Sequence, residues 1–216
     1  PSFCGRWGAW GAGGSGAASL VLRSCLRRPL LCDHWGARGA AGATGLAAVQ
    51  IGHALGARVI AVCSNEEKLH TAKQHGADVA INTGQDDVRN VIKSLTGGAG
   101  ADVIFDPVGG DLAKSLARSV GWNGRWLVIG FADGAIPKVP LNLPLVKGYS
   151  IVGVFWGSFC DRDPAQAQEN HRQLFEMAAS GTLTPHLHAV MPLSEAPRAL
   201  SQIEQRSVQG KIVLNP

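Results

Sequence analysis

The chain has 216 residues, of which 45% are hydrophobic and 17% are charged, a balance typical of a globular protein with a sizeable core. No apolar run reaches the roughly 20 residues that a membrane-spanning helix needs, so we expect no membrane segment. The net charge of +4 belongs to residues 1–38, which hold five of the 20 basic residues and one of the 16 acidic ones. The rest of the chain is neutral, which argues against a nucleic-acid partner.

Residues 1–38 differ from the rest of the chain. They are rich in Gly, Ala and Ser and show no helical or strand periodicity, so we expect an irregular leader that is disordered or not native to the fold. Arginines with almost no acids are also typical of an organelle transit peptide, and this alternative stays open. Asp33, His34 and Gly36 stand where a buried strand would carry β-branched residues, which argues against a central strand before Gly39.

From Gly39 onwards, helical and strand patterns alternate. In chain order they predict a helix over 44–55, a strand over 57–63, a helix over 64–77, a strand over 78–83, a helix over 85–98, a strand over 101–110, a helix over 111–124, and strands over 125–131 and 149–157. Ser64 and Glu67 have the spacing of a capping box. The alternation indicates βαβ units, and therefore an α/β fold with a doubly wound, Rossmann-like parallel sheet. We assign this first domain to residues 39–160; the glycine turn described below makes it the expected dinucleotide-binding domain.

After residue 160 the pattern changes. It predicts a long amphipathic helix over 163–183, a strand over 186–193, a helix over 194–205 and a closing strand over 210–216. Two strands do not form a stable sheet alone, so we expect them to pair with something else. We assign residues 161–216 to the remnant of a second, mostly absent domain.

A glycine-punctuated turn precedes the helix over 44–55. Gly42 and Gly45 match the last two glycines of the G-x-G-x-x-G motif, with Ala40 in place of the first. In this motif the second glycine lets the backbone approach a pyrophosphate, and the third allows close packing of helix and strand. Because the turn opens a series of βαβ units, it has the context that the motif needs.

The end of the strand over 57–63 bears on the choice between NAD and NADP. Cys63, Ser64 and Asn65 stand where NAD-binding proteins usually carry an acidic residue. Lys68 follows one turn later. A hydroxyl, an amide and a cation favour the 2′-phosphate of NADP, although the two glutamates between them argue mildly against it. Ser64 can cap the following helix at the same time.

The five cysteines and seven histidines are scattered along the chain. His186 and His188 would share one face of a strand, but no third ligand lies near them, so we expect no metal site. Few cysteines, odd in number, suit a reducing compartment. We therefore expect a cytoplasmic protein, or a mitochondrial one if residues 1–38 are a transit peptide.

A series of motifs carries a family resemblance. The motifs are "GAAGATGLAAVQIGHALGARVIAV", "ADVIFDPVGGD", "GRWLVIGFADG", "LNLPLVKGYSIVGVFWG" and "GKIVLNP". Over residues 39–216 the chain resembles the medium-chain dehydrogenase/reductase superfamily and, within it, the zinc-free quinone oxidoreductase branch related to zeta-crystallin. The resemblance implies an NADPH-dependent reductase of quinones or α,β-unsaturated carbonyls, without metal. Because the cofactor supplies the hydride, it implies no catalytic side chain.

The resemblance also implies which residues contact the cofactor. It places the pyrophosphate on Gly42, Ala43, Thr44 and Gly45, the 2′-phosphate near Ser64, Asn65 and Lys68, and the remainder of the cofactor near Val108, Gly109, Phe131, Phe155, Trp156 and Arg206. Phe131 and Phe155 have an alternative place in the sheet core, and Trp156 has one at a dimer edge. A homodimer through the edge strand near residues 150–157 is implied as well.

Two departures qualify the resemblance. Thr83 stands where many relatives carry a tyrosine near the adenosine. Relatives also have a large catalytic domain before the glycine turn, where this chain has residues 1–38. The favoured hypothesis is therefore a quinone reductase whose activity is impaired in this truncated chain, and the tail 161–216 would be the helix and strands of its catalytic domain. The alternatives are a nucleotide-binding module without catalysis and a non-functional truncated product.

Overall fold

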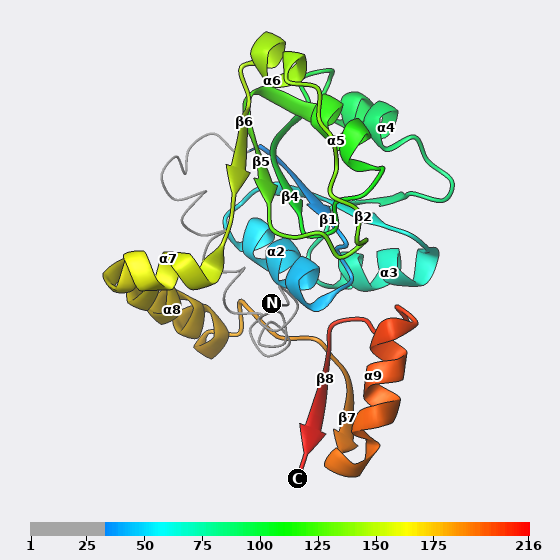
Figure 1. Ribbon diagram of the computed structural model, residues 1–216, viewed down its shortest axis with the longest axis vertical. Helices are drawn as coiled ribbons and strands as arrows, with labels where there is room; N and C mark the ends of the chain where they lie inside the picture. Colours follow the sequence, from blue (N-terminus) through cyan, green and yellow to red (C-terminus); the bar gives the residue numbers. More distant parts are fainter. Residues whose placement is uncertain (1–32) are drawn as a thin grey trace, which may run out of the picture.

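The computed structural model describes residues 33–216. A parallel six-stranded sheet forms its centre, with the strand order β3-β2-β1-β4-β5-β6 (Figure 1). The strands are β1 (His34–Arg38), β2 (Arg58–Cys63), β3 (Val79–Asn82), β4 (Ala101–Asp106), β5 (Val120–Val128) and β6 (Ser150–Gly153). The helices around them are α2 (Ala43–Ala54), α3 (Glu66–Gln74), α4 (Val88–Leu95), α5 (Ala113–Ser119), α6 (Asn142–Lys147), α7 (Trp156–Arg162) and α8 (Pro164–Ala179). The predicted α/β, Rossmann-like fold is confirmed.

Strand β1 corrects the prediction that the ordered fold starts at Gly39. It lies at the centre of the sheet and pairs with β2 on one side and β4 on the other. Its apolar burial comes from Trp35, which is fully buried, and Asp102 Oδ2 accepts the His34 backbone N–H at 2.9 Å. A tryptophan and two parallel neighbours thus hold a strand that lacks β-branched residues. The remainder of the expected leader, residues 1–32, lies outside the described residues.

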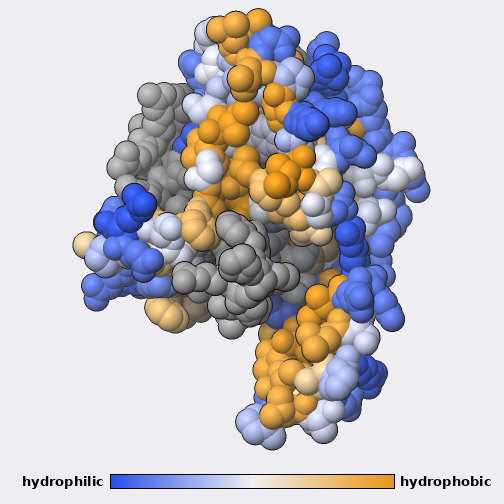
Figure 2. Space-filling model, viewed as in Figure 1, coloured by the Kyte–Doolittle hydropathy of each residue, from blue (hydrophilic) through white to orange (hydrophobic). Residues whose placement is uncertain are grey.

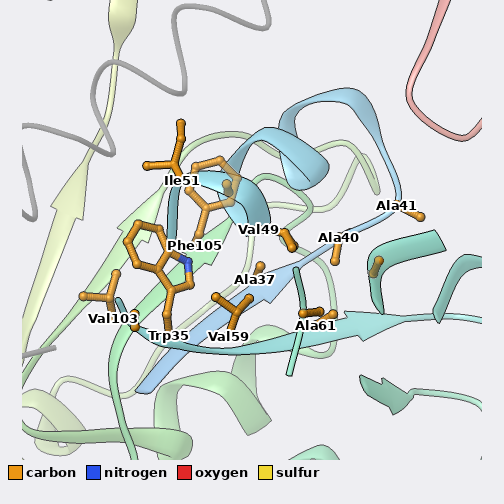
Figure 3. Close-up of a cluster of buried hydrophobic side chains, with 14 of the residues drawn as sticks. Trp35, Ala37, Ala40, Ala41, Val49, Ile51, Val59, Ala61, Val103 and Phe105 are labelled. Atoms are coloured by element: carbon orange, nitrogen blue, oxygen red, sulfur yellow. The ribbon is translucent and has the colours of Figure 1, made fainter. Parts of the chain in front are cut away.

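Hydrophobic side chains form a separate cluster on each face of the sheet. Val59 of β2 belongs to the cluster with Trp35 and Phe105, which α2 covers (Figure 3). The next residue, Ile60, belongs to the opposite cluster, where it joins Leu116 of α5. Because successive side chains of a strand point to opposite faces, a sheet buried on both faces needs continuous apolar strands, as the sequence has here.

Asparagine rather than serine caps helix α3, so the prediction for Ser64 is wrong. The helix begins at Glu66, and the Asn65 side chain accepts the backbone N–H of Lys68 at 3.0 Å. Glu67 does not turn back to the cap, because its carboxylate accepts a hydrogen bond from Gln209 Nε2 at 2.6 Å. The predicted capping box is displaced by one residue, because the N-cap is Asn65 and not Ser64.

The C-terminal strands β7 (Leu187–Pro192) and β8 (Lys211–Asn215) pair in parallel with each other and form a two-stranded sheet. The expectation that they would join another sheet is therefore not met within residues 33–216. The 3₁₀ turn η2 (Leu193–Glu195) and helix α9 (Ala196–Glu204) lie between them in the chain. The division of the chain at residue 160 stays a prediction.

Backbone and side-chain hydrogen bonds tie this tail to the larger sheet and its helices. Gly210 N donates to Ala41 O at 2.8 Å, which joins the residue before β8 to the turn after β1. The Gln50 side chain of α2 bonds both the N–H and the C=O of Thr184, at 2.7 and 2.9 Å. Within residues 33–216, no helix has the length and apolar composition that crossing a bilayer requires.

Candidate functional site

A cleft of about 680 Å³ opens at the carboxyl ends of β1, β2 and β4. Ligands of open parallel sheets usually bind at this edge, outside the carboxyl ends of the strands. Six of the predicted site residues line the cleft: Gly42, Thr44, Ser64, Lys68, Val108 and Arg206. The structure thus brings together residues from the first turn, the end of β2, the turn after β4 and the segment before β8.

The turn between β1 and α2 packs so closely against the helix that one position admits only glycine. A Cβ built on Gly45 would lie 2.1 Å from the carbonyl oxygen of Gly39 and 2.8 Å from Ala40 Cα. At Gly42 a Cβ would lie 3.4 Å from the same oxygen, which is ordinary contact. Gly45 is therefore needed for packing of helix on strand, as expected for the third glycine of a dinucleotide turn.

The N-terminus of α2 offers backbone donors to the cleft. Its first intrahelical bond runs from Leu46 N to Gly42 O at 2.8 Å, so the amides of Ala43, Thr44 and Gly45 precede that bond. No side chain caps them. Gly42 N is engaged within the turn, where it donates to Gly39 O at 3.0 Å. A helix end with unused N–H groups carries partial positive charge and favours an anion.

The end of β2 presents a hydroxyl and a cation, whereas its two glutamates are occupied elsewhere. Glu66 accepts a hydrogen bond from Asn82 Nδ2 at 2.6 Å, and Glu67 is held by Gln209 as described above. Neither glutamate lines the cleft, whereas Ser64 and Lys68 do. The objection that these acids raise against a phosphate is therefore weaker in the structure than in the sequence.

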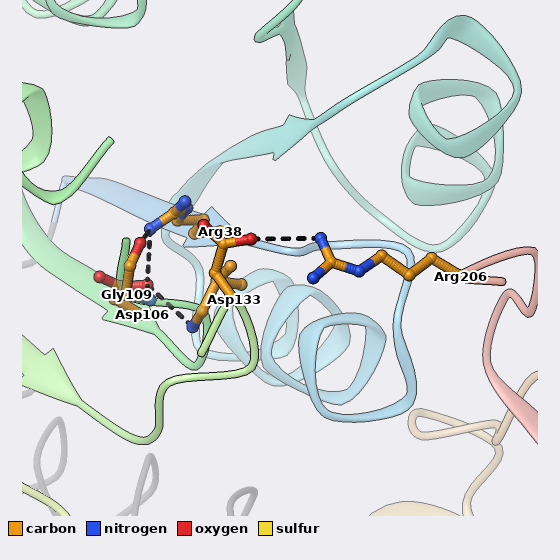
Figure 4. A network of polar contacts seen from close by, with 6 residues as sticks. Arg38, Asp106, Gly109, Asp133 and Arg206 are labelled. Atoms are coloured by element: carbon orange, nitrogen blue, oxygen red, sulfur yellow. Dashed lines mark hydrogen bonds and ion pairs between the residues drawn. The ribbon is translucent and has the colours of Figure 1, made fainter. Parts of the chain in front are cut away.

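Lys68 and Arg206 meet at the mouth of the cleft. The Lys68 ammonium donates to the backbone carbonyl of Arg206 at 2.9 Å. The Arg206 guanidinium forms an exposed ion pair with Asp133 at 3.2 Å (Figure 4). Arg206 has a φ of 56°, a left-handed conformation that turns the chain back towards α3 and carries its carbonyl to the lysine. Two positive side chains therefore border the same opening.

Sequence reasoning missed a buried arginine at this site. Arg38, the last residue of β1, lies in the cleft lining and pairs with Asp106 of β4 at 3.4 Å (Figure 4). Its guanidinium also donates to the carbonyl of Gly109. Asp106 Oδ1 accepts the N–H groups of Val108 and Gly109, both at 3.0 Å. The pair fixes the turn after β4 that lines the cleft.

Cys63 lies in the cleft lining with its side chain buried. Burial raises the pKa of its thiol, and this outweighs the opposite effects of the backbone N–H groups of Ala41 and Ala40 and of the Lys68 charge. The group is therefore a neutral thiol at pH 7, and a thiolate nucleophile is not what this position provides.

Three aromatic residues of the predicted site do not line the cleft. Phe131 is half-buried beside the turn after β4, where a Cβ on Gly109 would lie 2.8 Å from its ring. Phe155 is 64% exposed. The predicted strand over 149–157 includes Trp156, and here the prediction is wrong, because β6 ends at Gly153 and Trp156 begins α7.

Trp156 packs towards helix α8. Its ring centroid lies 5.3 Å from that of His171, edge to face, and 5.5 Å from that of Phe159. Among the residues that the structure describes, no group of three His, Cys, Asp or Glu side chains is placed to hold a metal ion.

Comparison with known proteins places the chain in a family. A model of the zinc-binding dehydrogenase family matches residues 43–178. A quinone oxidoreductase-like protein 2 homolog of Nematostella vectensis is 38% identical over 175 residues, which is 80% of this chain and 48% of that protein. The chain spans about half the length of the curated relatives that it matches.

Comparison with solved structures leads to the same family. A quinone oxidoreductase of Pseudomonas syringae pv. Tomato DC3000 has a TM-score of 0.83 at 27% identity, over 94% of this chain and 62% of that one. A quinone oxidoreductase of Escherichia coli, solved as a complex with NADPH, has a TM-score of 0.80 at 26% identity, over 93% of this chain and 63% of that one. From its sequence and its fold together, the chain belongs to the zinc-binding dehydrogenase family, as a quinone oxidoreductase-like member of the medium-chain dehydrogenases/reductases.

Proposed function

We propose that the chain binds NADPH in the cleft at the carboxyl ends of β1, β2 and β4 and serves hydride transfer to quinones or related α,β-unsaturated carbonyls, without zinc. One observation carries the proposal. The uncapped N-terminus of α2 and the Lys68 ammonium border the same cleft, while both glutamates near Lys68 are bonded elsewhere. The similar Escherichia coli enzyme, solved with NADPH, supports the choice of cofactor.

The residues present fit a phosphorylated dinucleotide. The N–H groups of Ala43, Thr44 and Gly45 would hold the pyrophosphate, because they are the amides that the helix leaves without a partner. Ser64 and Lys68 would hold the 2′-phosphate. Asn65 acts through Lys68, since its side chain accepts the Lys68 backbone N–H and fixes the first turn of α3.

Arg206 would add a second charge at the same opening. Its ion pair with Asp133 is exposed on both sides, and exposed pairs contribute only about 0–1 kcal/mol. Exchanging the Asp133 carboxylate for a phosphate therefore costs little. The Arg206 backbone carbonyl can remain the acceptor of the Lys68 ammonium, because that ammonium has three protons to donate.

Bound NADPH supplies the hydride, and the chain supplies position. The turn after β4, held by the Arg38–Asp106 pair, would set the depth of the cofactor through Val108 and Gly109. Phe131 packs against that turn at Gly109. Phe155 and Trp156 stand further along the chain, at the start of α7, and their contact with the cofactor stays a prediction. Holding the reacting atoms about 3–3.5 Å apart is the contribution that such a site makes to the rate.

We also propose that this chain turns over substrate more slowly than its relatives do. It matches about half of their length, so residues 33–216 correspond to part of those proteins. Steady-state reduction of several quinones, measured beside a cofactor titration, separates slow catalysis from binding alone.

The free thiols of Cys63 and Cys160 suit a reducing, cytoplasmic setting.

A homodimer through strand β6 completes the proposal. Among residues 33–216, this strand is at the edge of the sheet and pairs with β5 only. Ile151 on it is 42% exposed, and hydrophobic side chains gather over β6 and α6 (Figure 2). An unpaired, apolar edge strand favours pairing with a second copy across a twofold axis. Light scattering should give a dimer for the wild type and a monomer for Ile151→Lys; a wild-type monomer would overturn this part.

The cofactor proposal is tested by titration calorimetry with NADPH and NADH. Removing a charge-assisted contact typically costs about 1.5–3 kcal/mol, so Lys68→Ala should weaken NADPH binding about 10- to 100-fold and leave NADH binding nearly unchanged. Lys73→Ala is the matched control, because Lys73 is an exposed lysine of the same helix outside the cleft. Equal losses for both cofactors, or no NADPH binding by a folded wild type, would refute the proposal.

A further inference from the structure

A second, smaller cavity lies at the opposite edge of the sheet from the proposed cofactor cleft. Its volume is about 150 Å³. Gly100 comes directly before β4, Ser119 directly before β5, and Lys147 shortly before β6. All three line the cavity, which therefore opens at the amino ends of these strands, where α4, α5 and α6 end (Figure 1).

Four basic side chains line this cavity, and no acidic side chain does. They are Arg89 and Lys93 of α4, Arg118 of α5 and Lys147 of α6. Within residues 33–216 none of the four forms an ion pair. The two carboxylates just before α4 have partners of their own. Asp87 caps the helix, and Asp86 accepts the backbone N–H of Asn82 at 2.8 Å.

Helix dipoles account for part of this positive charge. Lys93, Arg118 and Lys147 lie in the last turns of their helices, where a cation compensates the partial negative charge of the free carbonyls. Three helix ends supply roughly −1.5 charges at about −0.5 each. The four cations therefore exceed the negative charge of the helix ends by more than two positive charges.

The positive charges around the cavity also repel one another. Lys147 is half-buried, and its ammonium donates to the carbonyl of Arg118 at 2.8 Å. Burial lowers the pKa of Lys147, and the nearby charge of Arg89 lowers it further. A negatively charged ligand between these side chains would relieve both effects, because it compensates desolvation and repulsion together.

A close contact between two loops fixes the shape of the cavity wall. A Cβ on Gly100 would lie 2.7 Å from Ser119 O and 2.8 Å from Gly121 N, so the loop before β4 touches the start of β5 directly. Gly98 N and Gly100 N donate to Lys93 O and Thr96 Oγ1, at 2.7 and 2.8 Å. The loop is thus already satisfied internally, and a ligand would be bound by the four side chains.

We propose that this cavity is a second anion site, which binds a phosphate or diphosphate group of a small phosphorylated molecule. Its volume of about 150 Å³ is well above the roughly 10–15 Å³ that one buried water needs. That space suits one such group with part of its hydration shell, while the rest of the ligand stays in solvent. Paired Arg and Lys side chains without a competing carboxylate are the chemistry that recognises phosphate.

The proposal is tested by amide NMR of the full chain titrated with inorganic pyrophosphate at low ionic strength. The amides of Gly98 and Gly100 should shift and saturate, and the Arg89→Gln/Lys93→Gln variant should weaken this binding at least 10-fold. The double variant Lys73→Gln/Lys114→Gln removes the same charge from exposed sites of α3 and α5 outside the cavity and should bind as the wild type does.

The outcome does not depend on the cofactor proposal. Pyrophosphate bound at the α2 N-terminus would shift Thr44 and Gly45 instead, at the opposite edge of the sheet. Unmoved Gly98 and Gly100 amides, or an equal loss of binding in both double variants, would overturn the second site. Lys147→Met provides an independent check: it should also weaken the Gly98 and Gly100 response at least 10-fold, and an unchanged response would count against the site.

Discussion

The close packing at Gly45 leads to a quantitative prediction about stability. In Gly45→Ala the added Cβ would lie 2.1 Å from Gly39 O, which is 1.3 Å short of the 3.4 Å at which ordinary contact begins. The atoms that it meets all belong to the backbone of the turn, at Gly39 and Ala40. No flexible side chain can move aside, so either α2 or the turn after β1 has to shift.

Overpacking of this kind typically costs about 1–3 kcal/mol and sometimes more, and a clash with backbone alone belongs at the upper end, at about 3 kcal/mol. For a domain of this size, each kcal/mol lowers the melting temperature by about 2–4 °C. We therefore expect Gly45→Ala to melt about 6–12 °C below the wild type. The same shift displaces the backbone N–H groups at the start of α2 that would hold the pyrophosphate, so NADPH binding should weaken as well.

Gly42→Ala is the matched comparison. Its Cβ makes only ordinary contact, and the residue has φ −76° and ψ 166°, which alanine adopts freely. A Gly-to-Ala change at a helix N-cap costs less than about 1 kcal/mol, so the melting temperature should fall by less than about 4 °C. The methyl group would nevertheless stand where the pyrophosphate approaches the backbone, and we expect NADPH affinity to drop at least 10-fold.

Circular-dichroism melts and calorimetric titration of both variants decide the matter. A melting temperature of Gly45→Ala equal to that of the wild type would refute the packing argument. A folded Gly42→Ala variant with full NADPH affinity would refute the placement of the pyrophosphate at this turn, and the packing argument would stand.

Two further predictions concern stability. Asp87→Ala removes the side chain that accepts Asn90 N at 3.0 Å and should cost about 1 kcal/mol, whereas Ser64→Ala should change the melting temperature little because Asn65 caps α3; equal effects in thermal melts would contradict the assignment of the cap. Burial lowers the pKa of His186, and the His75 and His188 charges lower it further. As the pH falls, His186 is therefore protonated at a higher pH in the unfolded chain than in the folded one. This contribution to stability is therefore complete above the unfolded pKa of about 6.5 and is lost as the pH falls towards the lowered value. Melting temperatures should decrease from pH 7 to pH 5, and less so in His186→Gln; identical pH profiles would contradict this.

Strands β2, β3 and β4 could be predicted because they are mostly apolar runs between helix caps and glycines. Strand β5 begins at Val120, inside the segment over 111–124 that the sequence predicts to be helical, so that prediction is wrong for residues 120–124. Strand β1 could not be predicted, since the sequence HWGAR has one large apolar residue and its stability depends on partners far along the chain. Trp35 fills the space between β1 and α2, and a Cβ on Gly52 of that helix would lie 3.2 Å from its ring. The tryptophan and the helical glycine fit each other, and this complementarity has no signature in local sequence.

The apolar run over 149–157 predicts a single strand, but β6 covers only Ser150–Gly153. Gly153 pairs with Val128, the last residue of β5. Beyond that pair, the part of the chain that the structure describes gives the edge strand only one further bond, from Val154 N to Val128 O at 3.0 Å. The chain therefore turns into α7 at Trp156. The length of a strand depends on its partner, which hydrophobic periodicity does not reveal.

At the site, the glycine turn and Lys68 could be predicted because their spacing is local. Arg38 could not, because its partner Asp106 is 68 residues away and becomes a neighbour only when β1 lies beside β4. A buried pair of this kind adds little to stability in general. Its consequence here is positional, since Asp106 accepts two N–H groups of the turn that lines the cleft.

The direction of the βα units explains why the two edges of the sheet should bind anions by different means. Helices that follow parallel strands begin at the carboxyl edge and end at the amino edge, so the first edge carries the positive helix ends and the second the negative ones. At α2 the donors are fixed backbone amides with Lys68 and Arg206 nearby, whereas the cavity beside α4, α5 and α6 depends on four side-chain cations that must first offset the helix ends. Charges on exposed side chains are screened by salt far more than a helix terminus enclosed in a cleft. Raising the salt concentration should therefore weaken pyrophosphate binding at Gly98 and Gly100 much more steeply than NADPH binding at the turn after β1.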